Sequence, residues 1–309
     1  MADISAKDVM ALRQKTGCGM MECKKALIEA NGDFEEAVKV LREKGLSVAA
    51  KKASRVASEG LVDIAKEGNV TAIVEINCET DFVAKNATFK AFVADVLKTI
   101  IDNKPKTVEE LLALNLHGSD RTVDAELKDK IFTIGENMTI RRFDVVNGVT
   151  GTYIHGNGAA GVITQFSTTN GIENTEGFAE YAKNVCMQIA AMNPTYVCSH
   201  CVPQSVIDSE KEILLAQIKN DPKLAGKPEA VIEKMVTGRI TKFYETNCLK
   251  EQTYVKDENL KVKDYTEAVA KELGGNIAIL DFVKYERGEG IEKKEEDFAA
   301  EIDKLVKGQ

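Results

Sequence analysis

Two cysteines close together in the sequence are the first candidates for chemistry. Cys198 and Cys201 flank Ser199 and His200, which is the pattern of half a structural zinc site. A complete site needs four ligands, and no second pair of Cys or His follows, so a bound metal is not expected. Cys78 and the Cys198–Cys201 pair still leave open, as an alternative, an enzyme that uses one of them as a thiol or metal centre.

The other common patterns of catalysis are missing. His117 and His155 stand apart from any Ser or Cys that they could activate as a nucleophile. The phosphate-binding pattern G-x-x-x-x-G-K-[ST] does not occur. We therefore predict no active site and no cofactor.

The segment Asn77-Cys78-Glu79-Thr80-Asp81-Phe82-Val83-Ala84 lies where a predicted strand gives way to a predicted helix. One interpretation is structural: Thr80 or Asp81 caps the helix. Phe82 and Val83 would then pack onto its first turn. The other interpretation is functional, because an acidic residue beside a bulky aromatic one at a rigid junction suits insertion into another protein. Physical chemistry alone favours the structural interpretation.

The elements that must position this segment follow from the apolar pattern. The first 58 residues predict three short helices: Ser5 with Asp8 is typical of a helix start, and Gly17 marks a break. Asp33 begins a third helix, which we expect to end near Gly45 and to be followed by a helical linker. These helices must pack on one another to bury their apolar stripes.

Beyond this region the apolar period becomes that of strands. Residues 61–78 predict a β-hairpin. In its second strand one face is apolar, whereas Thr71, Glu75 and Asn77 lie on a face that we expect to be exposed to water. A helix over residues 89–100 can cover the apolar face.

The same order recurs later in the chain. Residues 150–167 predict a second hairpin, and residues 178–189 a second covering helix. Strands at residues 138–146 and 277–285 complete the two sheets. Two charged helices between residues 203 and 252 have narrow apolar stripes, which favour a projecting antiparallel helical hairpin.

Composition limits the class of protein. The chain has 309 residues, of which 44% are hydrophobic and 29% charged, as is typical of a globular protein with more than one domain. The net charge of −8 argues against direct nucleic-acid binding, which needs a basic face. Residues 1–58 carry a net +3 and the rest −11, which is consistent with a separate N-terminal module.

The cysteine count and hydropathy indicate the compartment. Seven scattered cysteines do not resemble the framework of a secreted protein, so most are predicted to be reduced and buried. No N-terminal apolar segment is present, and no stretch approaches the roughly 20 apolar residues that span a bilayer. We predict a cytoplasmic protein without membrane contact.

Three stretches carry a resemblance to a known family. Residues 12–27 contain Thr16-Gly17-Cys18-Gly19-Met20-Met21, residues 75–84 contain Thr80-Asp81-Phe82-Val83, and residues 285–292 read Tyr285-Glu286-Arg287-Gly288-Glu289-Gly290-Ile291-Glu292. In this order they look like the two signatures and the C-terminal module of elongation factor Ts. The resemblance covers essentially the whole chain, and three long motifs in register favour the functional interpretation of residues 77–84.

The resemblance implies an α+β fold built from several parts. Residues 1–56 would form a three-helix ubiquitin-associated-like domain with a linker. Residues 57–145 and 146–285 would form two related subdomains, each an antiparallel sheet with helices. The helical hairpin at residues 203–252 would be inserted in the second subdomain, and residues 286–309 would be the C-terminal module.

The resemblance also implies a function: a guanine nucleotide exchange factor for elongation factor Tu that acts by protein–protein contact. Thr80, Asp81, Phe82 and Val83 would dislocate the partner's Mg²⁺ near bound GDP. The docking residues would be Leu12, Arg13, Thr16, Gly17, Gly19, Met20, Met21 and Lys24. The helical hairpin takes part in self-association in some members, and the loop at residues 198–201 is not part of the family pattern. A pure binding adaptor remains the alternative, beside the thiol enzyme.

Overall fold

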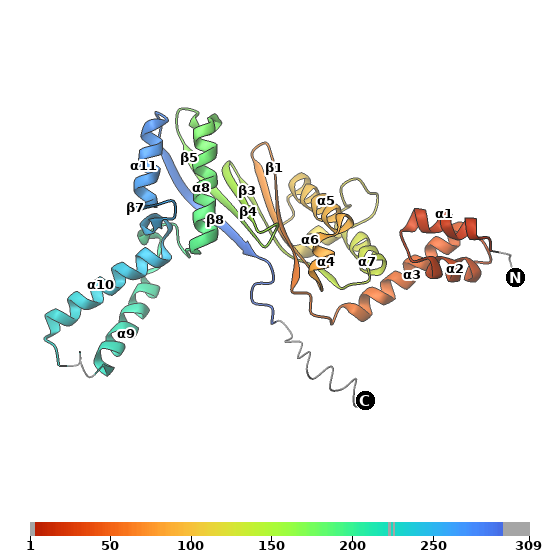
Figure 1. Cartoon of the computed structure of the whole chain (residues 1–309), viewed down its shortest axis with the longest axis horizontal. Helices are drawn as coiled ribbons and strands as arrows, with labels where there is room; N and C mark the ends of the chain where they lie inside the picture. The colour runs from red at the N-terminus through yellow and green to blue at the C-terminus, as the bar shows by residue number, and fades with distance from the viewer. Residues whose placement is uncertain (1–3, 222–223, 225, 293–309) are drawn as a thin grey trace.

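The computed structural model describes residues 4–221, 224 and 226–292. Within these ranges the chain forms an elongated row: a three-helix bundle, two sheets with covering helices, and a projecting helical hairpin (Figure 1). The predicted combination of small antiparallel sheets and helices is confirmed. In this part of the chain, no helix combines the length and the apolar character needed to cross a bilayer.

The N-terminal bundle consists of α1 (Ala6–Thr16), α2 (Met20–Glu29) and α3 (Phe34–Lys52). Ser5 and Asp8 form a capping box: the Asp8 backbone N donates to Ser5 Oγ, and the Ser5 backbone N donates to Asp8 Oδ2. Asp33 caps α3 by accepting a hydrogen bond from the Glu36 backbone N at 2.8 Å. The apolar stripes meet in a core whose fully buried members include Leu12, Cys23, Ala26 and Ala37.

The third helix does not end near Gly45, as predicted, but continues to Lys52. Gly45 lies against α7 (Val123–Ile134), where a Cβ atom would be 3.5 Å from Phe132 Cβ. The absence of a side chain lets the two helices approach closely, so Gly45 is a packing residue rather than a helix stop. The packing of α3 on α7 therefore holds the bundle against the core. Along the chain, residues 53–58 connect α3 to the first strand.

The first sheet is antiparallel, with strand order β1–β2–β3. Its strands are β1 (Glu59–Glu67), β2 (Val70–Cys78) and β3 (Met138–Asn147). The helix α5 (Ala87–Asn103) lays Phe89, Phe92 and Val96 on one face, beside α6 (Val108–Ala113) and α7. The predicted hairpin, third strand and covering helix are confirmed.

The second sheet has the same order of elements, with antiparallel strands β4–β5–β8. Its strands are β4 (Val149–His155), β5 (Ala160–Thr168) and β8 (Ile277–Glu286), covered by α8 (Glu176–Met192) and α11 (Val262–Glu272). Phe166 and Phe178 meet edge to face beneath α8, with ring centroids 5.4 Å apart. The small elements of this half are η1 (Ile172–Asn174), η2 (Ser199–Cys201), η3 (Leu249–Glu251), β6 (Thr253–Tyr254) and β7 (Asp257–Lys261).

The two sheets contact each other through the faces opposite their helices. This contact buries the face of β2 that we predicted to be exposed: Thr71, Glu75 and Asn77 are all buried. Thr71 Oγ1 lies 2.7 Å from Thr150 Oγ1 of the other sheet. An apolar layer of Val62, Ile73, Ile163 and Tyr285 fills the space beside them. The prediction was wrong because the cover comes from strands far along the chain.

Glu75 places a carboxylate in this layer, and four hydrogen-bond donors surround it. Arg142 Nε donates to Glu75 Oε2 at 2.6 Å, and Arg141 Nη1 donates to Glu75 Oε1 at 3.0 Å. The Gly288 backbone N and Asn77 Nδ2 donate to Oε1 at 2.7 Å and 3.1 Å. Burial by itself raises the pKa of this carboxyl, but these hydrogen bonds outweigh burial and hold the pKa below its ordinary value.

The chain after β8 is fastened at the same place. Gly288 has a φ of 69°, and a Cβ atom there would lie 2.3 Å from Ser58 O, so this turn requires glycine. Arg142 reaches the same segment by pairing with Glu289 Oε2 at 2.9 Å. The predicted C-terminal module begins at this turn, and its residues 293–309 lie outside the described residues.

The helices α9 (Gln204–Asn220) and α10 (Glu229–Asn247) form the helical hairpin, which extends away from the second sheet (Figure 1). Their narrow apolar stripes meet in a seam of Leu214, Ile218, Val236 and Ile240. Arg239 Nη1 donates to Gln217 Oε1 across the seam at 3.3 Å. The two predicted helices are confirmed, and their charged faces remain directed to water.

Replacing Glu75 by Gln should destabilise the core. The change leaves Arg141 and Arg142 without their shared carboxylate. We expect the free energy of unfolding to fall by about 3 kcal/mol, and not by more, because both guanidinium groups keep some contact with water. The exposed pair of Glu67 with Lys98 gives a matched control, because Glu67→Gln should cost less than about 1 kcal/mol. Urea unfolding of both variants measures the difference, and equal losses would contradict the role of the buried charge.

The effect of Glu75→Gln should also depend on pH. Because the folded-state pKa of Glu75 is lowered from its ordinary value of 4.5, ionisation stabilises the fold above that pH. This contribution is lost as the pH falls through the folded-state pKa. The stability difference between the wild type and Glu75→Gln should therefore be complete at pH 7 and shrink below about pH 4.5. A difference that stays constant down to pH 3 would show that folding does not lower the pKa of Glu75.

Candidate protein interaction site

The predicted junction lies where β2 ends and the short helix α4 (Asp81–Lys85) begins. Thr80 is the N-cap of α4, and its Oγ1 accepts a hydrogen bond from the Val83 backbone N at 3.4 Å. The prediction of Thr80 as a cap is confirmed. Val83 is buried, whereas Phe82 is 79% exposed. The predicted packing of Phe82 on the first turn is therefore wrong.

Glu136, from the turn between α7 and β3, fixes this cap. Its Oε2 accepts a hydrogen bond from the Thr80 backbone N at 2.9 Å, and its Oε1 accepts one from Thr80 Oγ1 at 2.6 Å. The next residue, Asn137, donates its backbone N to Glu79 Oε1 at 2.6 Å. Glu79 and Thr80 are thus hydrogen-bonded to Asn137 and Glu136, and these bonds set the direction in which the chain leaves β2.

Asp81 and Phe82 carry the charge and the apolar surface of the junction. Asp81 Oδ2 lies 2.5 Å from Lys85 Nζ, one turn later in α4. The hydrogen bond from this ammonium group holds the pKa of Asp81 below its ordinary value, so Asp81 is negatively charged at neutral pH. An exposed aromatic ring beside this charge, on a fixed backbone, suits contact with another protein.

A groove of about 720 Å³ lies beside the junction, between the core and the N-terminal bundle. Phe82 and Val83 line it from the core, and Thr16 and Gly17 line it from the end of α1. Phe132 of α7, which packs on the bundle, is a further lining residue. The structure therefore brings together residues from both predicted sets, although they lie far apart in the sequence.

The remaining predicted docking residues divide by burial. Leu12 is fully buried in the bundle, so its side chain has no surface to offer a partner. Met20 and Met21, at the start of α2, are 47% and 63% exposed. The polar and glycine positions of this set, Arg13, Gly19 and Lys24, are also exposed. Exposed methionines adapt their shape readily and are common on surfaces that bind other proteins.

The other sequence candidates do not form a catalytic centre. Burial raises the pKa of the Cys78 thiol to about 12, the opposite of what a reactive thiol needs. Cys198 and Cys201 are joined in a disulfide, and the described residues contain no group of three or more His, Cys, Asp or Glu placed to hold a metal. Residues 156–161 have the spacing G-x-G-x-x-G, but they form the turn of an antiparallel hairpin and the first two residues of β5, and they do not open a helix.

Sequence reasoning missed the two carboxylates that hold the site in place. Glu136 follows the end of a helix and precedes a strand, and nothing in its neighbours points to Thr80, which is 56 residues away. The alternation of polar and apolar residues in β2 predicts that Glu75 is exposed, and no signal within the strand indicates otherwise.

The groove and the exposed apolar side chains beside it suit a protein that works through contacts with another protein. A family model described as Elongation factor TS matches residues 79–289. Elongation factor Ts of Clostridium kluyveri is 47% identical over 99% of this chain and 100% of its own length. The proteins of the same name from Clostridium perfringens and Syntrophotalea carbinolica are 49% and 46% identical, each over 98% of this chain and 99% of its own length. The chain belongs to the elongation factor Ts family.

Family membership makes this chain a translation elongation factor. It implies a nucleotide exchange factor for elongation factor Tu that acts through protein interaction rather than as a conventional enzyme.

Removal of the Glu136 carboxylate should loosen the junction. Glu136→Ala deletes both hydrogen bonds to Thr80, so we expect amide hydrogen exchange at Thr80 and Val83 to rise about tenfold. Glu173→Ala is the control, because it removes a hydrogen bond of the same kind, from Thr168 Oγ1 at 2.8 Å, in the half of the core that contains the second sheet. Mass-spectrometric hydrogen exchange makes the comparison. Equal protection at Thr80 in both variants would show that Glu136 does not hold the cap.

Proposed function

We propose that this protein binds elongation factor Tu with GDP, dislocates the bound Mg²⁺ and thereby promotes GDP release, so that GTP can bind. The residues proposed for the dislocation are Thr80, Asp81, Phe82 and Val83. One observation carries the proposal: Phe82 is 79% exposed on a junction held by hydrogen bonds.

The physical role proposed for Phe82 is that of a wedge. In a GTPase, backbone amides, a Lys and Mg²⁺ hold GDP, and the ion neutralises phosphate charge. A ring inserted between two helices of the partner would shift the groups that position the ligands and waters of the ion. The charge of Asp81 would disturb the same network. Without the ion the phosphate charge is poorly compensated, and GDP leaves faster.

Coupling of this kind is reciprocal. If the exchange factor weakens the binding of GDP, then GDP or GTP must weaken the binding of the exchange factor by the same amount. The factor therefore accelerates exchange without choosing its direction, and an excess of GTP over GDP supplies the direction. In this way an exchange factor would support repeated cycles of its partner without binding nucleotide itself.

The N-terminal bundle is proposed to be the ubiquitin-associated-like docking domain, which binds the nucleotide-binding domain of the partner. The exposed Met20 and Met21 would provide apolar contact, and Arg13 and Lys24 would provide charge. Leu12 would act indirectly, by holding the bundle together. Since Thr16 and Gly17 share a groove with Phe82, docking and wedge insertion would involve the same partner molecule.

Three further properties belong to this proposal. The helical hairpin α9–α10, whose seam is narrow, is proposed to take part in self-association. Direct nucleic-acid binding is not expected, because the chain carries a net charge of −8. The protein is proposed to work in the cytoplasm, where translation takes place.

The wedge predicts a specific change in kinetics. At saturating concentration, Phe82→Ala should slow the release of fluorescent GDP from elongation factor Tu at least about tenfold, or about 1.4 kcal/mol, and Asp81→Ala should act in the same direction. Leu280→Ala is the matched control, because Leu280 is an exposed apolar residue of the second sheet. Stopped-flow fluorescence measures the rates. Unchanged saturating rates in both Phe82→Ala and Asp81→Ala would contradict the wedge role.

The docking surface predicts the complementary change. Met21→Ala should raise the concentration needed for half-maximal GDP release several-fold and leave the saturating rate almost unchanged, since it removes contact that is the same before and during release. The same stopped-flow series gives both quantities. Binding of the wild type to elongation factor Tu without faster GDP release would instead favour a pure adaptor.

A further inference from the structure

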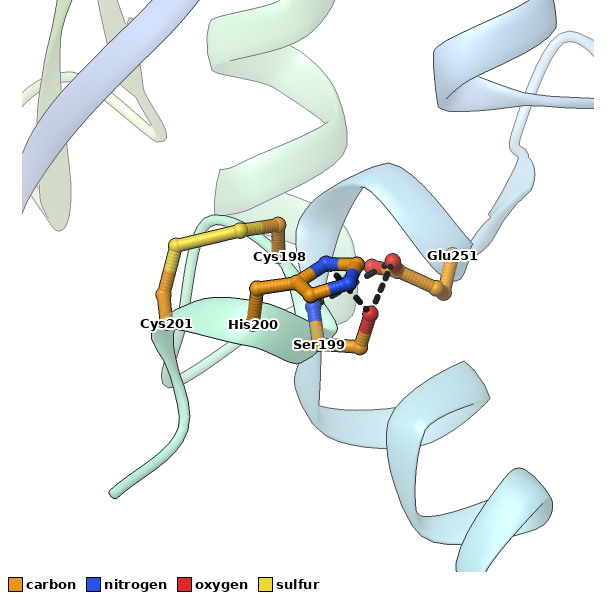
Figure 2. Close-up of a disulfide and its surroundings, with 5 residues drawn as sticks. All are labelled: Cys198, Ser199, His200, Cys201 and Glu251. Carbon is orange, nitrogen blue, oxygen red and sulfur yellow. Dashed lines mark hydrogen bonds between the residues drawn. A yellow bond between two sulfur atoms is a disulfide. The ribbon is translucent and has the colours of Figure 1, made fainter. Parts of the chain in front are cut away.

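The root of the helical hairpin carries a pair of cysteines that the proposed function does not use. Cys198 and Cys201 form a disulfide with Cα atoms 5.2 Å apart (Figure 2). They enclose Ser199 and His200 in a turn that contains η2 and precedes α9. Cys201 and His200 are exposed, and Cys198 is half-buried. This sulfur pair is open to another molecule.

The other five cysteines are different. All of them are buried, and all are free: Cys18, Cys23, Cys78, Cys186 and Cys248. Burial raises the pKa of Cys78 and Cys186 to about 12, so their thiols remain protonated and unreactive at neutral pH. Among the cysteines, only Cys198 and Cys201 are therefore accessible to another molecule.

The disulfide is not needed to hold the root together. It closes a ring across only two intervening residues, and in the chain-entropy account such short rings stabilise a fold less than long ones. The two segments of the root are joined independently by three hydrogen bonds: Leu249 N to Tyr196 O at 2.9 Å, Lys250 N to Val197 O at 3.0 Å, and Ser199 Oγ to Glu251 Oε1 at 2.9 Å (Figure 2 for the last). The root can therefore keep its shape when the sulfur bond opens.

We propose that Cys198 and Cys201 form a redox-active site, whose reaction partner is a protein dithiol of the C-x-x-C class. Translation takes place where thiol pools keep most cysteines reduced, and disulfides formed there are usually transient. An exposed, reversible pair fits that setting. The site goes beyond nucleotide exchange and does not depend on the wedge.

The reaction is a thiol–disulfide exchange in two steps. A thiolate of the reductant attacks Cys201 Sγ, the exposed sulfur, and forms a mixed disulfide. Cys198 Sγ leaves as a thiolate and takes up a proton. The second thiol of the reductant then attacks the first sulfur of the reductant, which is bonded to Cys201. This step forms a disulfide within the reductant and releases Cys201 Sγ, which is protonated in turn. In total, two electrons and two protons pass from the dithiol to this protein.

Trapping of the mixed disulfide tests the site. The oxidised full chain is incubated with a thioredoxin-type reductant in which the second cysteine is replaced by Ser, and the adduct is mapped by mass spectrometry after alkylation. We expect a one-to-one adduct at Cys201, with Cys198 alkylated as a free thiol. Cys198→Ser should abolish the adduct, because no disulfide remains to be attacked. The control variant Cys18→Ala, in the N-terminal bundle, should form it as the wild type does.

A thiol count after reduction of the native protein completes the test. The folded protein is treated with a tenfold excess of the intact reductant and is alkylated only after denaturation, which exposes the buried thiols. The number of alkylated cysteines should rise from the five free ones to seven. An excess of the oxidised reductant should reverse the change. A disulfide that persists under the reducing conditions, an adduct at Cys198 or at a buried cysteine, or seven thiols in the presence of the oxidised reductant would each overturn the proposal.

Discussion

The buried carboxylate of Glu75 is the interaction on which the arrangement of the core depends. A charge removed from water must be matched by donors, and here the donors come from β2 itself, from β3 and from the turn after β8. Because Arg142 also pairs with Glu289, the same network holds the end of the described chain. If the two sheets slid past each other, Glu75 would lose its hydrogen bond from the Gly288 backbone, and Arg142 would lose its pairing with Glu289.

This constraint explains how a protein can present an aromatic residue to solvent in a fixed direction. The strand that carries Glu75 runs directly into Thr80, and Glu136 holds the cap at that end. Phe82 therefore projects from a backbone that is ordered before any partner binds, which reduces the entropy lost on binding. The helix α3, packed on α7 at Gly45, places the N-terminal bundle at the opposite side of the same groove.

Local signals explain which expectations were confirmed. The capping box at Ser5, the turn signals between strands and the apolar stripe of α5 depend on residues within one or two turns of one another. Expectations failed where distant contacts overruled a local signal. Gly45 lies within α3 because Phe132 packs against it, and the polar face of β2 is buried because a second sheet covers it.

The sequence by itself therefore determined the helices and strands, the motifs that carry the family resemblance, and the net negative charge that argues against nucleic-acid binding. The tertiary structure alone decided that Glu75 is buried and paired, that Glu136 holds Thr80, and that Phe82 shares a groove with the N-terminal bundle. It also decided that Cys198 and Cys201 are bonded. The physical reason is distance along the chain. Periodicity and capping are properties of neighbouring residues. In contrast, Glu75 contacts Gly288, 213 positions away, and Glu136 contacts Thr80, 56 positions away.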